Sequence, residues 1–425
     1  MTGFVTVEPA AGPILASLRP PGSKSQTIRA IVTSALAEGV SRVEHPLEAD
    51  DTLIARRAMQ SFGVDMTADD GAWTVSGSGG RLRGPSRPID AGASGLTARA
   101  VIALASLADG PTTVVGRDRL PERPMGGLLD ALNSLGVATT AVDGHLPVTI
   151  HGTGALPGGT VSVHSNQTSQ FATALLLAAP RARGELVITP TGLEGSQRYL
   201  EMTIRTMEEF GAVVQPIGAG YRIRPTGYYG TVVVIEPDAS AAVYPMVAAA
   251  ITGGRVTIEG LGTESLQPDL EIAAVLGQMG CAVRQTGTAT TIEAPTDGLN
   301  PIDIDLSGSP DGSLAVAVAA LFAVGPSLLR GLGSLRHKES DRLTALATEI
   351  TRLGASATVV GDELHITPGA LHAARVESYG DHRVAMSFAL AGLRVPGIEI
   401  SDPDVVAKTW PSFWTMLAGI AQSIA

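Results

Sequence analysis

The sequence contains a single cysteine, Cys281, among 425 residues. One cysteine excludes an intramolecular disulfide framework and every zinc site that needs several cysteines. The stretch from Met279 to Val283 has the pattern of a helix end that runs into a strand. We therefore expect Cys281 to be a buried structural thiol.

Positive charge is also scarce, because 30 Lys and Arg stand against 41 Asp and Glu, for a formal net charge of −11. This balance excludes a general basic field that would attract nucleic acid or an anionic bilayer. If the ligands of the protein are anions, the site that binds them must be basic locally.

Long apolar runs are missing as well. The longest unbroken run, Leu314 to Val324, has 11 residues, whereas a span of a bilayer needs about 20. The N-terminal residues show no basic region followed by an apolar core, so we expect no signal peptide. These absences favour a soluble, cytoplasmic protein.

The residues that are present indicate a layered α/β protein. Hydrophobic residues make up 44% of the chain, and aromatic residues only 4%, so Ala, Val and Leu dominate the apolar content. This much apolar surface excludes general disorder. The length predicts roughly three domains of about 150 residues, and 50 Gly and 27 Pro indicate many turns between short elements.

An internal repeat organises the chain. Six Ala-rich, Leu-rich and Val-rich segments each end at a glycine and pass into a short strand pattern. The closing glycines are at positions 39, 110, 184, 254, 325 and 397, so they are 71, 74, 70, 71 and 72 residues apart. The sequence therefore predicts six units of about 71 residues.

A second, amphipathic helix recurs in five of these units. It ends in an apolar residue followed by glycine, as in Phe62-Gly63 and Leu353-Gly354, and alternating apolar residues follow. Glycine is the usual residue at the left-handed position that closes a helix. Each unit then reads as strand, helix, strand, helix and one or two strands, and six units pack most simply as two lobes of three. The chain would cross between lobes near residues 20–22 and 236–240.

Polar residues gather at the N-terminal ends of the Ala-rich helices, where free backbone N–H groups and the helix dipole bind anions. Ordinary helix capping explains many of them, but it does not explain cations, which the dipole opposes. For each cation alone, a solvated surface charge is the alternative; as a set, they favour an anionic ligand. The cations are Lys24, Arg29, Arg99, Arg123, Lys338, Arg342, Arg383 and Lys408.

Two acids stand among these cations. Glu339 lies beside Lys338 and one helical turn before Arg342, and Asp311 follows Pro310 at a helix start. Two carboxylates of opposite roles among cations suit general acid–base chemistry on an anionic substrate. Asp311 as a helix cap and Glu339 as an ion-pair member remain equally open.

The sequence motifs of nucleotide and metal sites are missing. Residues 21–25 lack the spacing of a phosphate-binding loop, and residues 77–80 lack the third glycine of a dinucleotide fingerprint. None of the 8 histidines forms a metal-binding pair. We expect no metal and no cofactor.

Seven ordered motifs resemble the 5-enolpyruvylshikimate-3-phosphate (EPSP) synthases, also called 3-phosphoshikimate 1-carboxyvinyltransferases. The similarity runs from Pro20 to about Trp414. The motifs are PPGSKSQTIRA, DRLPERPMGGLLDAL, TSQFATALLLAAP, EPDASAAVYP, RHKESDRL, YGDHRVAM and Lys408 to Pro411.

The resemblance implies the enolpyruvyl transferase fold: two lobes of three βαβαββ units each, with the active site in the inter-lobe cleft. One lobe would comprise residues 22–238, and the other residues 1–21 together with 239–425. The family moves the enolpyruvyl group of phosphoenolpyruvate to the 5-hydroxyl of shikimate 3-phosphate, in the shikimate pathway of aromatic amino acid biosynthesis. We expect these two small molecules as ligands and a monomeric protein.

The resemblance also implies site residues. Asp311 would accept the proton of the attacking hydroxyl, and Glu339 would protonate the methylene carbon of phosphoenolpyruvate; with Lys24 they form the catalytic set. The phosphoenolpyruvate contacts would be Lys24, Gly95, Arg123, Gln170, Arg342, Arg383 and Lys408. The shikimate 3-phosphate contacts would be Lys24, Ser25, Arg29, Thr168, Ser169, Gln170, Ser196, Tyr199, Asp311 and Lys338.

Departures from the family pattern concentrate on the acceptor side, at Ile28, Ala93, Leu96, Ser334 and Arg198. They leave open another phosphorylated acceptor, such as a nucleoside monophosphate. A non-catalytic anion-binding protein is a further alternative, although two acids among anions argue against it. The sister family that acts on UDP-N-acetylglucosamine carries a reactive loop cysteine, unlike the position expected for Cys281. Gly95 leaves room for the competitive inhibitor glyphosate, so we expect inhibition.

Overall fold

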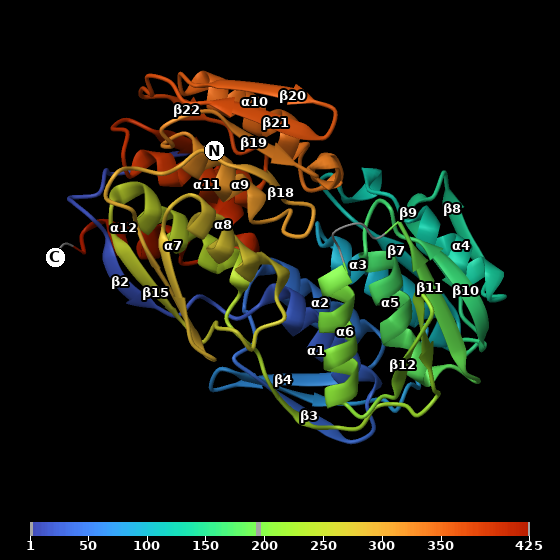
Figure 1. The fold of residues 1–425 in the computed structure, drawn as a ribbon. Coiled ribbons are helices and arrows are strands. Elements are labelled where there is room, and N and C mark those ends of the chain that lie inside the picture. The colour runs from blue at the N-terminus through green and yellow to red at the C-terminus, as the bar shows by residue number, and fades with distance from the viewer. Residues whose placement is uncertain (1–2, 193–196, 424–425) are drawn as a thin grey trace. The chain divides into compact units, whose positions relative to one another are not determined.

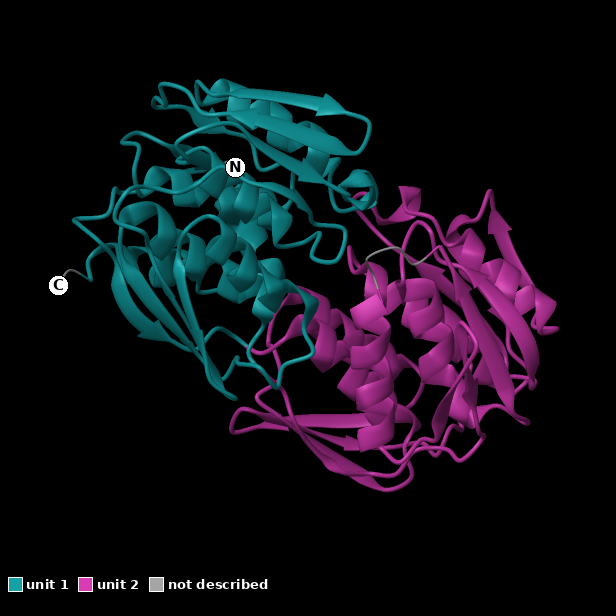
Figure 2. Cartoon of the chain, viewed as in Figure 1, with its two compact units in different colours: residues 1–21, 237–425 teal, residues 22–236 magenta. Residues whose placement is uncertain are grey.

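The computed structural model describes residues 3–192 and 197–423, and the chain divides into two compact units (Figure 2). Unit 2 is Gly22–Glu236, and unit 1 joins Met1–Pro21 to Pro237–Ala425. The second boundary therefore precedes Pro237, whereas we expected it after Asp238. The two units have separate hydrophobic cores.

Within the described residues, unit 2 contains three four-stranded sheets with the same topology. In each sheet the first two strands are parallel and the remaining pairs are antiparallel. The sheets are β14(Val232–Val234)-β3(Val40–Glu44)-β5(Ala72–Ser76)-β4(Asp65–Asp69), β6(Ile89–Asp90)-β7(Pro111–Val115)-β9(His145–His151)-β8(Thr139–Val142) and β10(Gly159–His164)-β11(Leu186–Thr191)-β13(Gly220–Ile223)-β12(Val214–Ile217).

Within the described residues, unit 1 repeats this plan in two four-stranded sheets, and its third sheet has three strands. Strand β2, from the N-terminal segment of the unit, pairs in parallel with β15, across more than half of the chain. The sheets are β16(Ala282–Gln285)-β17(Ala289–Glu293)-β15(Arg255–Glu259)-β2(Leu15–Leu18), β18(Asp303–Asp305)-β19(Ser327–Arg330)-β21(Glu363–Thr367)-β20(Ser356–Val360) and β1(Phe4–Thr6)-β23(Glu399–Ser401)-β22(Arg375–Val376). The six sheets correspond to the six predicted repeats, three in each unit.

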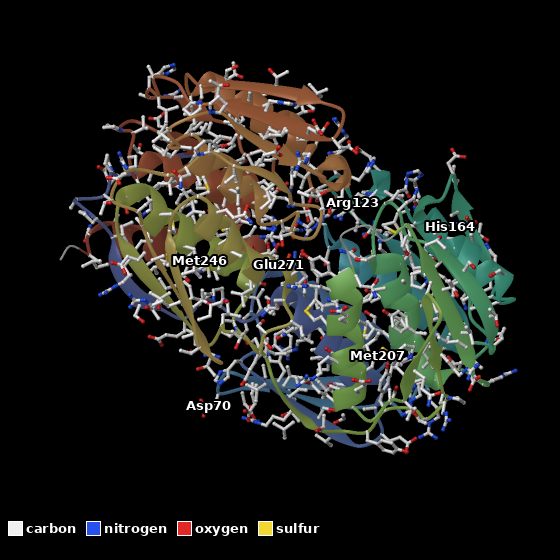
Figure 3. The ribbon with its side chains drawn as sticks, in the orientation of Figure 1. Asp70, Arg123, His164, Met207, Met246 and Glu271 are labelled. Carbon is white, nitrogen blue, oxygen red and sulfur yellow. The ribbon has the colours of Figure 1, made fainter. Side chains whose placement is uncertain are left out.

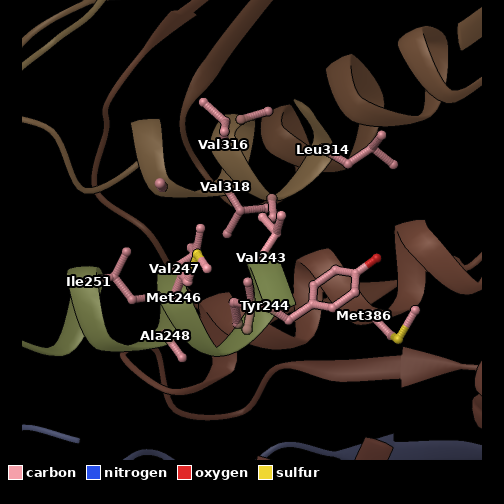
Figure 4. Close-up of a cluster of buried hydrophobic side chains, with 14 of the residues drawn as sticks. Val243, Tyr244, Met246, Val247, Ala248, Ile251, Leu314, Val316, Val318 and Met386 are labelled. Atoms are coloured by element: carbon pink, nitrogen blue, oxygen red, sulfur yellow. The ribbon is translucent and has the colours of Figure 1, made fainter. Parts of the chain in front are cut away.

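The six Ala-rich segments form helices, as predicted. Beyond the polar residues near their starts these helices are mostly apolar, and such helices are stable only when they are buried; every residue of α9, for example, is buried. In unit 1, α7, α9 and α11 pack against one another between the sheets (Figures 1 and 4). The helices are α1(Lys24–Leu36), α3(Gly95–Leu104), α5(Gln170–Ala178), α7(Ala239–Thr252), α9(Ser313–Ala320) and α11(His382–Gly392).

The second helix of each of five repeats is confirmed too. The glycine after each has a left-handed backbone, with φ between +84° and +99°, as the closing position requires. These helices are α2(Asp50–Ser61), α4(Gly126–Ser134), α6(Gln197–Glu209), α8(Ile272–Gln278) and α10(Arg342–Arg352), and a twelfth helix, α12(Phe413–Ala421), follows the last repeat.

Cys281 is a buried thiol between α8 and β16, in agreement with the prediction. Burial raises the pKa of this thiol to about 11, so it is protonated at neutral pH. Among the described residues, the helices are all too short or too polar to cross a membrane.

Candidate functional site

Arg342 lies at the centre of a charged cluster in unit 1. It is the first residue of α10 and is 1% exposed. Its Nη1 donates to Asp311 Oδ1 at 2.8 Å, and its Nη2 donates to Glu339 Oε2 at 2.9 Å. One buried guanidinium therefore holds both acids that the sequence analysis selected.

The local structure around these acids differs in detail from the expectation. We expected Glu339 one helical turn before Arg342, but α10 begins at Arg342 with Asp341 as its N-cap, so Glu339 lies before the helix. α9 likewise begins at Ser313, so Asp311 lies in the preceding turn. Both carboxylates are thus on short loops, where helix capping does not occupy their oxygens.

Asp311 is surrounded by cations. In addition to Arg342, Arg383 Nη2 lies 3.0 Å from Asp311 Oδ2, and Lys338 Nζ lies 3.4 Å from Asp311 Oδ1. The side chain of Asp311 is 19% exposed, whereas that of Arg383 is 4% exposed. The structure therefore brings Asp311, Lys338, Glu339, Arg342 and Arg383 together.

Asp381 is a member of this cluster that the sequence analysis did not assign. It caps α11 by accepting a hydrogen bond from Arg383 N, and its two oxygens accept from Arg342 Nε (2.7 Å) and Nη2 (3.1 Å). Ser340 Oγ also donates to it, at 3.0 Å. The position of Asp381 beside His382 and Arg383 is the sequence signal that could have identified it. A helix-capping acid next to one site cation is well placed to bind and orient a second cation, here Arg342.

The acids determine the protonation of the cations. Burial by itself lowers the pKa of Arg342, but the charges of Asp381, Glu339 and Asp311 raise the pKa above its ordinary value. Burial likewise lowers the pKa of Arg383, but nearby negative charge, above all that of Asp311, raises this pKa well above its ordinary value. Both guanidinium groups therefore stay charged inside the protein.

Tyr244 of α7 lies next to Arg383, whose Nη1 donates to Tyr244 Oη at 3.5 Å. Burial raises the pKa of this phenol to about 12, against the opposing charge of Arg383. Lys408, the remaining predicted cation of unit 1, ends the short 3-10 helix η6(Pro403–Lys408) and is 9% exposed. η6 packs against α11, the helix that carries Arg383.

Most of the described residues that were predicted in unit 2 lie at or just before the N-terminal ends of its helices. Lys24 is the first residue of α1, whose N-cap is Ser23, and its Nζ lies 3.3 Å from Asp51 Oδ2 on α2. Asp51 is buried and was not selected from the sequence, because an acid in the first turn of a helix is ordinary. Here the Asp51 carboxylate keeps the charge of Lys24 at the start of α1, where the helix dipole disfavours a cation.

Arg29 is buried between α1 and α6. Its Nε donates to Thr203 Oγ1 (2.8 Å), its Nη1 to Ser25 O (2.9 Å) and its Nη2 to Tyr199 O (3.3 Å). Burial lowers the pKa of Arg29 to about 10. Arg29 thereby fixes the backbone at Ser25 and Tyr199, two other residues that were predicted to contact shikimate 3-phosphate.

Gly95, Arg123 and Gln170 are connected through Arg99. Arg99 Nη1 donates to Gln170 Oε1 at 2.6 Å, and Nη2 donates to Pro124 O at 3.0 Å. A Cβ added at Gly95 would lie 2.7 Å from Arg99 Nη1 and 2.9 Å from Arg123 Cζ. The guanidinium groups of Arg99 and Arg123 therefore pack directly against Gly95, where any side chain would displace them. Arg123 is labelled in Figure 3.

Thr168 and Ser169 lead into α5. Thr168 Oγ1 accepts from Gln170 N at 3.2 Å, and Ser169 is the N-cap of the helix. Tyr199 is in the first turn of α6, half-buried. Ser196, the remaining predicted residue, lies outside the described residues. In residues 3–192 and 197–423, no group of three or more His, Cys, Asp or Glu side chains is arranged to hold a metal ion.

Comparison with known proteins decides the family. The model of the family EPSP synthase (3-phosphoshikimate 1-carboxyvinyltransferase) matches residues 10–417. A 3-phosphoshikimate 1-carboxyvinyltransferase of Methanoregula boonei is 38% identical, over 99% of this chain and 100% of its own. One of Syntrophobacter fumaroxidans is 40% identical, over 96% and 97%. The chain belongs to the EPSP synthase family.

Solved structures agree with this assignment. EPSP synthase of Acinetobacter baumannii has 29% identity and a TM-score of 0.81, with 99% of this chain and 98% of that chain covered. The enolpyruvyl transferase NikO of Streptomyces tendae has a TM-score of 0.79 over the same shares, at 18% identity, which shows the fold alone. The predicted two-lobed α/β fold is thus confirmed.

The departures from the EPSP synthase pattern fall partly in the interior. Ile28 is 0% exposed and Leu96 is 6% exposed, and both belong to the hydrophobic core of unit 2. Ala93 and Ser334 are half-buried, and Arg198 is exposed. Ile28 and Leu96 therefore have a packing role in unit 2.

Proposed function

We propose that this member of the EPSP synthase family transfers the enolpyruvyl group of phosphoenolpyruvate to the 5-hydroxyl of shikimate 3-phosphate and releases phosphate. The observation that carries the mechanism is the position of Asp311 and Glu339 on the same buried guanidinium, that of Arg342. Two carboxyl groups held at a short separation can take a proton from one substrate and give a proton to the other.

In the addition step, Asp311 accepts the proton of the 5-hydroxyl while the oxygen forms a bond to C2 of phosphoenolpyruvate. Glu339 gives a proton to C3, so the methylene becomes a methyl group and a tetrahedral intermediate forms. No bond to the protein is made. Lys338, Arg342 and Arg383 around Asp311 would stabilise the negative charge of the substrate phosphate and carboxylate groups during this step.

In the elimination step, Glu339 takes a proton back from the methyl group, and the bond from C2 to the phosphate oxygen breaks. The proton held by Asp311 leaves with the phosphate, so both carboxyl groups return to their starting states. Cations that are already fixed by buried ion pairs need little rearrangement as the charge moves, which is why preorganised groups catalyse well.

The residues of unit 2 would bind the anionic ends of the same two substrates. Lys24, Gly95, Arg123 and Gln170 would hold phosphoenolpyruvate with Arg342, Arg383 and Lys408 of unit 1. Ser25, Arg29, Thr168, Ser169, Ser196 and Tyr199 would hold shikimate 3-phosphate with Lys24, Gln170, Asp311 and Lys338. We propose further that the protein acts as a monomer in the cytoplasm, without a cofactor.

The test is phosphate release from phosphoenolpyruvate with three acceptors: shikimate 3-phosphate, unphosphorylated shikimate and a nucleoside monophosphate. We expect release with shikimate 3-phosphate and formation of its enolpyruvyl ether, and little release with the other two. Phosphate release with the nucleoside monophosphate and with neither of the other two would mean that the acceptor is a nucleotide and not shikimate 3-phosphate. Tight binding of phosphoenolpyruvate without release from any acceptor would indicate a non-catalytic binding protein.

A further inference from the structure

Asp269 is a buried acid of unit 1 to which the mechanism above assigns no role. It is 2% exposed and lies on the short 3-10 helix η4(Pro268–Glu271), which packs against α7 and α8. Oδ1 of Asp269 accepts a hydrogen bond from Gly312 N at 3.3 Å, and Oδ2 accepts one from Ser240 Oγ. Neither of these donors carries a charge.

These contacts fix the turn that carries Asp311. The hydrogen bond from Gly312 N is made by the peptide that directly follows Asp311. One residue before Asp269, Pro268 O accepts from Ser309 Oγ at 3.0 Å. The turn is thus held to η4 on both sides of Asp311, so the direction of the Asp311 side chain depends on η4.

The charge of Asp269 also acts on Asp311. Burial raises the pKa of Asp269 to about 6, and the second largest cause is the charge of Asp311. Because repulsion between two carboxylates is mutual, each one increases the proton affinity of the other. A buried acid whose nearest donors are neutral is costly to keep for packing alone.

We propose that Asp269 is a positioning residue for Asp311: it orients the turn of Asp311 through Gly312 N, and its negative charge makes Asp311 a stronger base. This inference rests on the proposed function, in which Asp311 takes the hydroxyl proton. The step itself is unchanged, because the proton goes to Asp311 and Asp269 exchanges none with the substrate.

Other charged groups around Asp269 come from the start of α7, from α11 and from η4 itself. Asp238, at the start of α7, adds to the repulsion, and Arg383 of α11 opposes it. The Ser240 hydrogen bond also favours the charged form of Asp269. α8 contributes no titratable side chain, and Glu271 is the other acid of η4 itself. Ser240 is thus the neutral neighbour whose removal changes the charge state of Asp269.

Two substitutions act on the negative charge of this acid: one removes the charge, and the other raises the pH at which it forms. Asp269→Asn keeps an oxygen for Gly312 N but removes the charge. Without that charge Asp311 is a weaker base, so we expect kcat to fall by about tenfold or more and the acid limb of the kcat–pH profile to move to lower pH. Ser240→Ala keeps the acid but removes the hydrogen bond that favours its charged form, so Asp269 ionises at higher pH. Because Asp311 becomes the stronger base only once Asp269 is charged, the acid limb should move to higher pH with it.

The experiment measures phosphate release against pH for wild type, both variants and Asp303→Asn, an exposed acid on β18. The KM values should change much less than kcat, and Asp303→Asn should match the wild type. If the wild type turns over but both variants keep its profile, the inference is wrong and the proposed function stands. A wild type that releases no phosphate would overturn the proposed function itself. If Asp269→Asn does not fold, the kcat–pH profile of Ser240→Ala tests the inference by itself. An acid limb that stays in place, or that moves to lower pH, contradicts the inference.

Discussion

Among the described glycines of unit 2, Gly95 is the one at which an added carbon would disturb two predicted site arginines. A Cβ there would lie 2.7 Å from Arg99 Nη1 and 2.9 Å from Arg123 Cζ, both closer than real contacts allow. Since these atoms are the ends of flexible side chains, the fold would survive and the guanidinium groups would move.

For Gly95→Ala we therefore expect the KM for phosphoenolpyruvate to rise by about tenfold or more, since small displacements of binding groups are costly. We also expect weaker inhibition by glyphosate. The control is Gly126→Ala in the same unit, where an added Cβ meets nothing within 4 Å. Equal KM values for the two variants would contradict the packing argument.

Glu349 gives a prediction for stability against pH. It is fully buried on α10, with Tyr379 Oη donating to Oε1 at 2.6 Å and Arg352 Nε 3.0 Å from Oε2. Burial raises the pKa of Glu349 despite these two partners. The folded state thus binds the proton more tightly than the unfolded state. The favourable contribution is present below the unfolded pKa and is lost as pH rises through the folded pKa.

Glutamine cannot ionise, so the stability of Glu349→Gln relative to the wild type should increase as pH rises. We expect the difference in Tm, variant minus wild type, to be more positive at about pH 7.5 than at about pH 4. Thermal unfolding followed by circular dichroism at both pH values measures it. A difference that becomes more negative with pH would mean that the ion pair with Arg352 outweighs burial.

At the scale of the element, α4 carries a glycine at each end with opposite roles. Gly126 is its first residue, with an ordinary backbone, and Gly136 follows its end with φ +84°. An added Cβ would meet nothing within 4 Å at either position. The two substitutions therefore differ only in backbone conformation.

We expect Gly136→Ala to destabilise the fold by about 1 kcal/mol, because alanine resists the left-handed backbone. Gly126→Ala should stabilise it by about 0.5–1 kcal/mol through helix propensity. Denaturant unfolding of both variants checks the signs. Two changes of the same sign would show that α4 does not end at Gly136 in solution.

The helices are also the elements that the sequence predicts best. Apolar spacing and a closing glycine are local signals, so all eleven helices that it indicated are present. The partners of strands are not local. β14 pairs with β3, and β2 with β15, across about half of the chain, and no pattern within either strand specifies its partner.

At the scale of the whole molecule, unit 2 is one continuous stretch with its own core and three complete sheets. We therefore expect a fragment of residues 22–236 to fold alone, with a cooperative thermal transition, but to release no phosphate. Circular dichroism and one-dimensional NMR would check this. A fragment without dispersed methyl signals would show that unit 2 depends on unit 1.

The site was predictable to the extent that its residues belong to motifs. Asp311, Glu339 and Arg342 meet as expected because motif residues lie at the helix ends that converge in unit 1. Asp51 and Asp269 were missed since a buried acid and an ordinary cap look alike in a sequence. Only the tertiary structure shows that each of these acids lies beside a site residue.

The most direct test of the account is single-turnover phosphate release from phosphoenolpyruvate with shikimate 3-phosphate. Wild type is compared with the Asp311→Asn/Glu339→Gln double variant. The account predicts rapid release by the wild type, and in the double variant, which still binds phosphoenolpyruvate, a rate lower by at least about 10³-fold. A folded double variant that releases phosphate at nearly the wild-type rate would contradict the central claim that these two carboxyl groups carry the proton transfers.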